Sequence, residues 1–424
     1  MYKKWGFLLN MTLVVIYESF LYIFFQDKFS FVSRLTNKLS RMNMLYVKIF
    51  QALALNISFV DETLDKYFTE FTDNAPYSSN DIDYLTLYNV SNEYNLDFNR
   101  DGFISPINSG MISLVFKAYD GSNNPIAVKI KRLDIERKLE ESIENLLFCV
   151  RLFFNNTQIS EIIHKNIDIV KGQTNFSDEI RNMSKFKENC KNLDYVVIPK
   201  ANDTITSKYP NVIVMDYIDG IKVEHISNGD RLLYAEQIIK VGLVTLFVHG
   251  FTHGDLHSGN IVFIRDTDNN VMKLGILDFG IVNNICPVFK ETIFSLVIDI
   301  FNTPIEDMSK KILLCGIIEP VDKIKKMSKE QFKLINDITI ETLNDIIKDT
   351  NQIHIYKCID RINDLAKSKY FKELDIKVSE EFVKLQFVIA MSHGITMKLC
   401  GDKCIDLVDK VMRDLFHTNL LFDE

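Results

Sequence analysis

The sequence has no excess of positive charge and no paired-cysteine motif, and both absences narrow its possible functions. Its 424 residues carry 49 lysines and arginines against 57 aspartates and glutamates, a net charge of −8. Nucleic-acid-binding proteins gather basic charge, so we expect no nucleic-acid partner. The seven cysteines form no Cys-x-x-Cys pair, which favours unpaired thiols in a reducing compartment over a metal or redox motif. Internal repeats and low-complexity blocks are absent as well.

The sequence also lacks a small-residue cleavage site after its long apolar stretch, so we expect no removed signal peptide. Nearly every residue from Trp5 to Phe25 is apolar, which is long enough for a membrane-spanning helix. Asn10 and Glu18 oppose that interpretation, because a carboxylate near the bilayer centre costs about 3 kcal/mol. Three alternatives stay open for residues 1–28: a membrane anchor, a helix on a membrane surface, and a helix buried in the protein. We expect an intracellular protein that associates with a membrane through this segment.

Strand patterns early in the chain and helical patterns late in it predict an α+β protein with a bilobal, kinase-like fold. A helical extension is expected at 29–82, with a turn-rich linker at its end. The kinase-like domain then covers 83–424, with a small lobe at about 83–218 and a largely helical lobe at about 219–424. The sequence predicts strands at 114–119, 126–131 and 211–217, and helices at 30–72, 134–168, 235–250 and most of 285–420.

Two short motifs in the middle of the chain indicate the chemistry. The first, His-Gly-Asp-Leu-His-Ser-Gly-Asn, occupies residues 253–260, and the second, Asp-Phe-Gly, begins at Asp278. An aspartate and an asparagine five positions apart, followed by Asp-Phe-Gly, are what kinase-like folds use to handle ATP and Mg²⁺. Asp255 would then face the group to be phosphorylated, while Asn260 and Asp278 would hold the metal. The alternative is that these residues only form turns, since the chain is rich in Asp and Asn.

The segment between the two motifs has the pattern of a β-hairpin. Residues 261–264 and 273–277 are short apolar runs, and a cluster of turn-forming residues at 266–270 separates them. This hairpin would put Asn260 at the start of one strand and Asp278 at the end of its neighbour. The two side chains could then converge on one metal ion.

Lys129, in the strand pattern Ala-Val-Lys, is the candidate for the lysine that reaches the α- and β-phosphates of ATP. Lys131 has the same parity on the strand and could be the surface lysine. A buried lysine keeps its charge only beside an anion, and Glu179 on a later helix is the expected partner. The acidic cluster at 140–144 is an alternative, more in keeping with a solvated helix face.

Two further segments complete the predicted nucleotide site. Ser109 and Gly110 lie in the loop before the first strand, where small residues let backbone N–H groups approach phosphate oxygens. Met215 and Tyr217 end a buried strand at the expected adenine-binding hinge. Tyr217 could equally be a packing residue.

These pieces, in this order, resemble the UbiB family of atypical kinases, which is linked to coenzyme Q biosynthesis. The likeness runs from about residue 35 to 300. The Lys-x-Gly-Gln motif of that family is similar to Lys48 and Gln51, and its Glu-x-Asp motif falls on Gln173 and Asn175, ahead of Glu179. Its Val-Lys, its histidine-rich motif with Asp and Asn, and its Asp-Phe-Gly match the residues described above.

The departures from the family pattern concern the surroundings of the catalytic motifs. Phe50 replaces the glycine of the first motif, and the alanine-rich loop is reduced to Gly110 and its neighbours. Gln173 and Asn175 carry no charge that could help to hold a cation. The resemblance implies that the helix with Lys48 occupies the cleft where a protein substrate would lie, which argues against protein phosphorylation.

The sequence therefore favours an ATP- and Mg²⁺-dependent, UbiB-like kinase or ATPase that is membrane-associated and acts on a small or lipid-like target. One alternative is a small-molecule kinase of the choline or aminoglycoside type, which shares the motif at 253–260 but lacks the Lys48 helix. The other is a nucleotide-binding scaffold without turnover, which the amides at 173 and 175 suggest.

Overall fold

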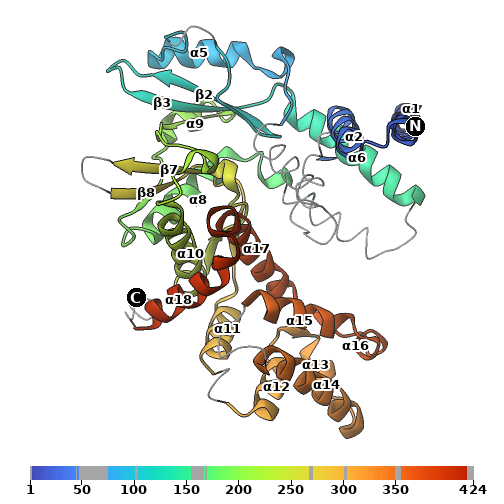
Figure 1. The fold of residues 1–424 in the computed structure, drawn as a ribbon. Helices are drawn as coiled ribbons and strands as arrows, with labels where there is room; N and C mark the ends of the chain where they lie inside the picture. Colours follow the sequence, from blue (N-terminus) through green and yellow to red (C-terminus); the bar gives the residue numbers. More distant parts are fainter. Residues whose placement is uncertain are drawn as a thin grey trace. The chain divides into compact units, whose positions relative to one another are not determined.

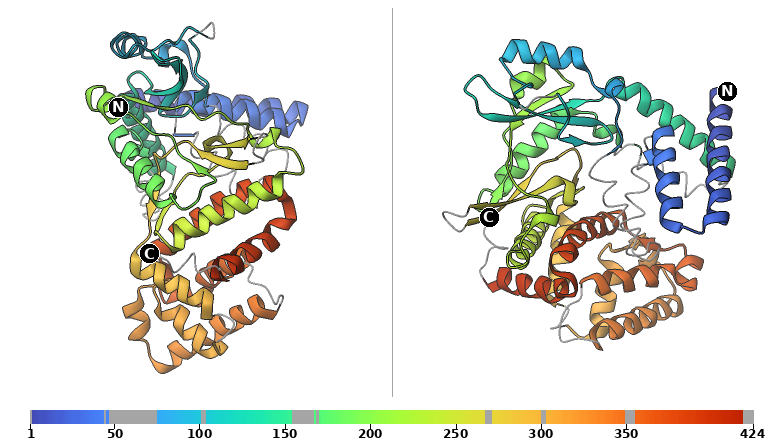
Figure 2. Two further views of the ribbon diagram at one scale, coloured as in Figure 1. Left: turned by 90° about the vertical axis from the view of Figure 1, so that its left-hand side faces the viewer. Right: turned by 45° about the horizontal axis from the view of Figure 1, so that its top comes forward.

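The structure is a computed structural model that describes residues 2–43, 45–46, 75–100, 104–153, 167, 170–266, 271–299, 303–348 and 355–417. Helices, small sheets and a mostly helical C-terminal part follow one another along the chain (Figures 1 and 2). The chain divides into two compact units. Unit 1 comprises Met1–Lys185, Ile198–Asp219 and Ile276–Ile281, and unit 2 comprises Phe186–Val197, Gly220–Gly275 and Val282–Glu424.

Unit 1 is built on a four-stranded antiparallel sheet with strand order β1-β2-β3-β5. A tight turn at Asp120 joins the two long strands, where the Asp120 side chain accepts hydrogen bonds from the N–H groups of Ser122 and Asn124. The register pairs Lys129 with Val115 on one side and with Ile213 on the other. The strands are β1 (Asn108–Ser109), β2 (Ser113–Tyr119), β3 (Pro125–Lys131) and β5 (Val212–Asp216).

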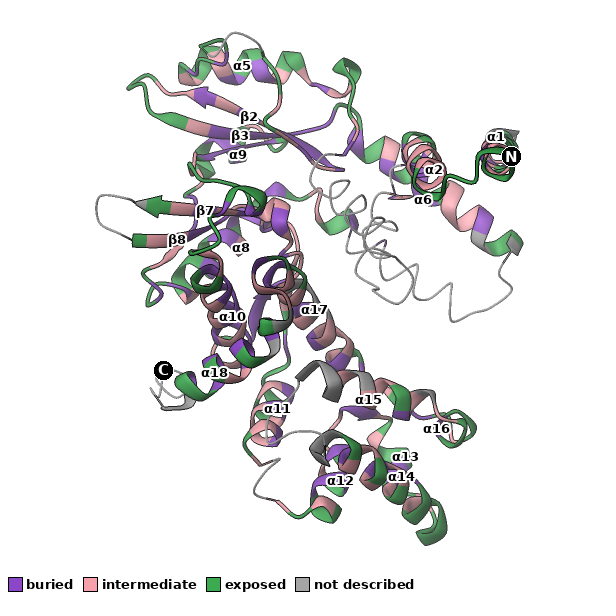
Figure 3. Cartoon of the chain, viewed as in Figure 1, coloured by how far each residue is buried: buried purple, intermediate pink, exposed green. Residues whose placement is uncertain are grey.

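Strand alternation decides which side chains of this sheet are core and which are free for chemistry. Val128 and Ile130 of β3 pack into a cluster with Leu87 and Val90 of α5 (Tyr84–Tyr94) and with α9 (Asp203–Lys208). Since successive residues of a strand point to opposite faces, Lys129 points away from that cluster. Both β2 and β3 are largely buried (Figure 3).

The N-terminal part of unit 1 is a helical hairpin followed by a long helix. Helix α1 (Tyr2–Phe25) packs on α2 (Lys28–Met42), whose start is capped by the Asp27 side chain accepting from the Ser30 N–H. Helix α1 also contacts α6 (Ile135–Phe153), where Trp5 packs edge-on against Phe148 with ring centroids 5.3 Å apart.

Unit 2 combines two small sheets of kinase-like topology with a large helical part. Strands β4 (Val196–Val197), β8 (Val271–Ile276) and β7 (Ile261–Asp266) form one sheet, and β6 (Phe251–His253) pairs with β9 (Val282–Asn284). Strands β10 (Ile318–Glu319) and β11 (Lys377–Val378) form a third pair. The helices of unit 2 are α10 (Arg231–Phe247), α11 (Pro287–Asp299), α12 (Ile305–Leu314), α13 (Val321–Lys325), α14 (Lys329–Lys348), α15 (Ile355–Lys367), α16 (Lys369–Glu373), α17 (Glu380–Cys400) and α18 (Cys404–His417).

The predicted α+β class is confirmed, and the long strands lie within a residue or two of their predicted bounds. The segment 75–82, predicted as part of a linker, is instead attached to unit 1, because Asp81 binds Arg132 and Lys138 and Ile82 is buried. The helix predicted at 134–168 is observed as α6 up to residue 153, beyond which most of it lies outside the described residues. The domain boundaries proposed from the sequence stay predictions.

Candidate active site

Lys129, Glu179 and Asp278 form an ion cluster within unit 1. They come from β3, from α8 (Phe176–Asn189) and from the segment that follows β8. The Lys129 Nζ atom lies 2.5 Å from Glu179 Oε1 and 2.9 Å from Asp278 Oδ2. The Lys129 and Glu179 side chains are 7% and 2% exposed, whereas that of Asp278 is 36% exposed. One buried ammonium therefore serves two carboxylates, and only the second of these faces solvent.

Burial and charge act against each other in this cluster. Burial alone would lower the pKa of the Lys129 ammonium, but the charges of Asp278 and Glu179 outweigh it and raise that pKa above its usual value. Burial raises the pKa of the Glu179 carboxyl to about 7, although the Lys129 charge opposes this rise; the Asp278 charge adds to it. Lys129 thus stays charged, and Glu179 takes up a proton near neutral pH.

The Asp278–Gly280 turn is held in place from both sides. The Gly280 N–H donates to Asp278 Oδ1 at 2.9 Å, so each carboxylate oxygen of Asp278 has a protein donor. Phe279 is fully buried, and the Asn182 amide of α8 donates to its carbonyl at 3.1 Å. A Cβ at Gly280 would lie 3.2 Å from Asp278 Oδ1, which explains why a residue without a side chain suits this turn.

Gln173 and Asn175, the two amides that replace acids in the UbiB pattern, lie just before the first residue of α8. The side chain of Gln173 lies beside Gly280, with its Cγ atom 3.7 Å from the place of a Gly280 Cβ. Its Oε1 atom is buried and has no hydrogen-bond partner in the described structure. Asn175 instead acts locally, because its side chain donates to Asp178 Oδ2 at 2.6 Å and accepts from the Asp178 N–H.

The motif at 253–260 forms a compact loop in unit 2 in which the backbone fixes the side chains. The Asn260 Nδ2 atom donates to the Asp255 carbonyl at 2.8 Å. The ring of His253 is buried, and its Nδ1 atom accepts from the Asp255 N–H at 3.1 Å. His257 accepts from the Gly259 N–H through Nδ1, and its Nε2 atom lies 3.9 Å from Asp255 Oδ2. The two histidines thus orient this loop, a role that the sequence analysis did not assign.

The loop at Ser109 and Gly110 is occupied by contacts within the protein. The Gly110 N–H donates to the Ser113 carbonyl at 2.9 Å, and the buried Ser109 hydroxyl donates to the Ala75 carbonyl at 2.7 Å. Both groups thus have partners within the protein in this arrangement, and their role at a phosphate stays a prediction. Arg132, which the sequence analysis missed, donates to the Gly110 carbonyl and to the Ser109 hydroxyl.

The remaining predicted residues are not members of the ion cluster: three of them lie in or next to strands β3 and β5, and two lie outside the residues that the structure describes. Met215 is buried in β5 opposite Ala127, and Tyr217 follows the strand with the Lys117 Nζ atom 4.9 Å from its ring centroid. Lys131 is buried as well and pairs with Glu136 at 2.8 Å, so it is not the surface lysine of the prediction. Lys48 and Gln51 lie outside the described residues.

A family model for the ABC1 atypical kinase-like domain matches residues 81–312, more than half of the chain. The chain belongs to the ABC1 atypical kinase-like family. Its UbiB-like character is supported by a relative from Shewanella baltica, a probable protein kinase UbiB, which is 28% identical over 49% of this chain and 38% of its own length. The resemblance found in the sequence is thus confirmed.

Two further proteins resemble this chain, one in its sequence and one in its structure. A probable serine/threonine-protein kinase abkB from Dictyostelium discoideum is 26% identical over 57% of this chain and 37% of its own length. The complex structure of Rv3197 with erythromycin from Mycobacterium tuberculosis has a TM-score of 0.49 at 15% identity, over 86% of this chain and 90% of that chain. The chain spans less than half the length of the curated relatives it matches.

Each of the two units contains a side chain whose oxygen atoms are of the kind that binds magnesium. Asp278 of unit 1 offers a partly exposed carboxylate. Asn260 of unit 2 presents its side-chain oxygen, because its side-chain nitrogen is bonded to the Asp255 carbonyl. Oxygen atoms are the ligands that Mg²⁺ prefers, and few of them come from the protein when phosphates supply the others. Within the described ranges, no group of three or more His, Cys, Asp or Glu side chains is arranged to hold an ion unaided.

Proposed function

We propose that this ABC1 atypical kinase-like protein uses ATP with Mg²⁺ and transfers the terminal phosphoryl group to a small or lipid-like acceptor, or to water. The observation that carries the proposal is the buried Lys129 between Glu179 and Asp278. A buried ammonium held by a helix carboxylate, with a second carboxylate partly exposed beside it, is what a protein needs to receive a triphosphate and its metal. The kinase-like family to which the chain belongs supports the same activity.

Each residue has a definite task in this proposal. Glu179 holds Lys129 in position, and Lys129 binds the α- and β-phosphates. Asp278 would be a ligand of Mg²⁺, as would Asn260, and the ion would neutralise charge on the phosphates. Asp255 orients the acceptor hydroxyl or water and takes its proton. Rate enhancement then comes mainly from positioning and charge neutralisation.

Nucleotide binding would require one exchange of partners in the ion cluster. The Asp278 Oδ2 atom that would ligate the metal accepts a hydrogen bond from Lys129 in this structure. Lys129 would therefore release Asp278 on turning to the phosphates, while Glu179 keeps it in place from the buried side. The exchange balances charge only if the metal arrives with the nucleotide.

A phosphate-release assay on the purified full-length chain tests this activity. We expect turnover that needs both ATP and Mg²⁺ and that Asp278→Asn abolishes. Asp337→Asn serves as the matched control, because Asp337 is an exposed residue of α14. Nucleotide binding without turnover in the wild-type protein would instead favour the scaffold function that Gln173 and Asn175 suggest.

We also propose that the α1–α2 hairpin attaches the protein to a membrane surface. An 18-residue stretch within Lys4–Phe25 has a mean hydropathy of 1.8, and only 11% of its residues are buried, which supports a membrane contact rather than a core helix. Glu18, the one acidic residue of this helix, is fully buried between Arg34 and Lys38 of α2, with oxygen–nitrogen distances of 2.8 and 2.6 Å. If α1 spanned a bilayer with this pairing intact, both cations of α2 would enter the hydrocarbon, at about 3 kcal/mol each.

An interfacial hairpin agrees with the charges of α2, which carries four basic residues and no acidic one. Basic side chains near a membrane surface are attracted to anionic lipids by about 1 kcal/mol each, and salt screens this attraction. We expect vesicle flotation to show binding that rises with the anionic lipid content and falls with salt. Deletion of residues 1–28 should abolish it. Alkaline carbonate extraction that leaves the wild-type chain in the membrane would favour a spanning anchor instead.

A further inference from the structure

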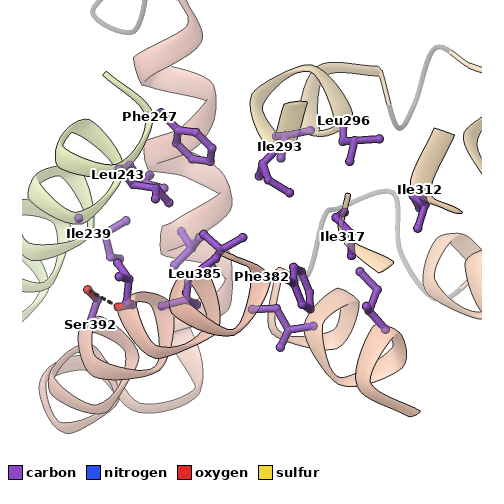
Figure 4. A pocket seen from close by; sticks show the side chains of 18 of the residues that line it. Ile239, Leu243, Phe247, Ile293, Leu296, Ile312, Ile317, Phe382, Leu385 and Ser392 are labelled. Atoms are coloured by element: carbon purple, nitrogen blue, oxygen red, sulfur yellow. Dashed lines mark hydrogen bonds between the residues drawn. The ribbon is translucent and has the colours of Figure 1, made fainter. Parts of the chain in front are cut away.

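Unit 2 contains an apolar cavity that the proposed reaction does not use. It has a volume of about 150 Å³ and lies among helices α10, α11 and α17 and their neighbours. Ile239, Leu243 and Phe247 of α10 face Phe382 and Leu385 of α17 around it (Figure 4). Because the cavity shares no residue with the ion cluster or with the motif at 253–260, it is a separate feature of the molecule.

The wall of the cavity offers a ligand almost no hydrogen bonds. Only two of its lining side chains are polar, those of Ser392 and Thr396, and Gly242 lines it without a side chain. The Ser392 hydroxyl donates to the Val388 carbonyl at 3.2 Å, and the Thr396 hydroxyl donates to the Ser392 carbonyl at 3.0 Å. Both hydroxyl protons are thus committed to the backbone of α17. A polar occupant would lose its bonds to water without replacement, which excludes ions and sugars.

The size of the cavity indicates the size of the occupant. A dry cavity of about 150 Å³ lined by Leu, Ile and Phe binds benzene in another protein. Most proteins leave few voids of that size, because an empty one weakens the packing around it. This cavity is partly open, so a ligand could enter without unfolding of the helices.

We propose that this cavity binds an uncharged hydrocarbon group about the size of benzene or a few carbons larger. The group could be a free molecule or the end of the chain of an amphiphile whose polar head stays outside. The two sources share the same contacts, namely the apolar side chains of α10, α11 and α17. Binding there depends neither on ATP nor on the membrane hairpin.

Calorimetric titration of the full-length protein with butylbenzene tests the proposal. We expect saturable binding of butylbenzene to the wild-type chain and much weaker binding of phenol, whose hydroxyl would give up hydrogen bonds to water. Leu385→Trp fills the cavity from α17 and should weaken butylbenzene binding at least ten-fold. The matched control is Leu334→Trp, because Leu334 is an exposed leucine of α14 that does not line the cavity. Its affinity should equal that of the wild type.

Two additions make the result unambiguous. If circular dichroism shows that Leu385→Trp does not fold, Leu243→Phe fills the cavity with a smaller side chain from α10. Octanoate distinguishes the sources: binding that both fillings abolish identifies the chain of an amphiphile, and binding of butylbenzene alone identifies a free hydrocarbon. Absence of saturable butylbenzene binding to the wild type, or binding that neither filling weakens, would overturn the proposal.

Discussion

Replacing Lys129 by methionine gives the most direct test of the ion cluster, because the change keeps an unbranched side chain and removes the ammonium group with its charge and its hydrogen bonds to Glu179 and Asp278. In the wild-type protein Lys129 is 7% exposed and Glu179 is 2% exposed. Removal of one partner of a buried ion pair typically costs about 3 to 5 kcal/mol, since the other charge stays buried without compensation. Glu179 can escape that penalty by taking up a proton, so the loss of stability should depend on pH.

The sign and size of this dependence follow from the pKa of Glu179. Burial raises this pKa from its ordinary value of 4.5 to about 7, so between these two pH values the folded protein holds a proton that the unfolded chain releases. The contribution of Glu179 to stability is therefore fully present below pH 4.5 and is lost as the pH rises to about 7, after which it is constant. Without the Lys129 charge the pKa lies higher still. The variant then keeps losing about 1.4 kcal/mol per pH unit above pH 7, while the wild type does not.

Urea unfolding followed by circular dichroism at pH 6, 7, 8 and 8.5 measures this difference. The gap between wild type and Lys129→Met should be nearly constant from pH 6 to 7 and should widen by about 2 kcal/mol from pH 7 to 8.5. The double variant Lys129→Met/Glu179→Gln lacks the carboxyl group whose raised pKa causes the widening and should not show it. A gap that is the same at all four pH values, or that widens equally in the double variant, would refute the electrostatic account of the cluster.

Three further substitutions test other contacts. Gln173→Glu adds a carboxylate beside Gly280. If this carboxylate attracts the cation by about 1 kcal/mol, the half-saturating Mg²⁺ concentration for ATP turnover should fall about five-fold. An unchanged or higher concentration would count against a cation nearby. Arg132→Met removes the arginine donor from the partly buried carbonyls of Pro76 and Gly110 and should lower the free energy of unfolding by about 3 kcal/mol, measured in the same urea experiment; a loss below 1 kcal/mol would contradict this. Glu18→Ala should open the α1–α2 hairpin and speed trypsin cleavage after Arg34 and Lys38; equal cleavage rates would show that the ion pairs do not hold it.

The fold class and the main strands could be predicted because local patterns determine them. Alternation of apolar residues marks β2 and β3, and a turn-forming Asp120 joins them. The pairing of Lys129 with Glu179 could be proposed because a buried strand lysine needs an anion from a helix, although 50 residues separate the two. Their catalytic roles stay predictions.

Contacts that depend on tertiary packing could not be predicted. The segment 75–82 has the composition of a linker, yet Arg132 binds the Pro76 carbonyl from 56 residues away and ties it down. Ser109 lies in a segment with the composition of a phosphate loop, yet its hydroxyl is bonded to the Ala75 carbonyl from 34 residues away. In both cases the local sequence allowed the observed structure without specifying it, and the choice was made by a partner that only folding brings near.

The charges around the ion cluster connect the departures in sequence with the proposed chemistry. Asp278 and Glu179 face one ammonium, so with both carboxylates ionised the cluster has a net negative charge before any nucleotide arrives. Acids at 173 and 175 would add two more negative charges at the same end of α8. With amides there, the Gln173 Oε1 atom is buried without a partner, and the site opposes the approach of a triphosphate less. In the proposed site the same change leaves fewer anionic ligands for a metal, so we expect cation binding to depend on the Asp278 carboxylate. The amides therefore fit a site that binds nucleotide and metal together more readily than one that binds the metal first.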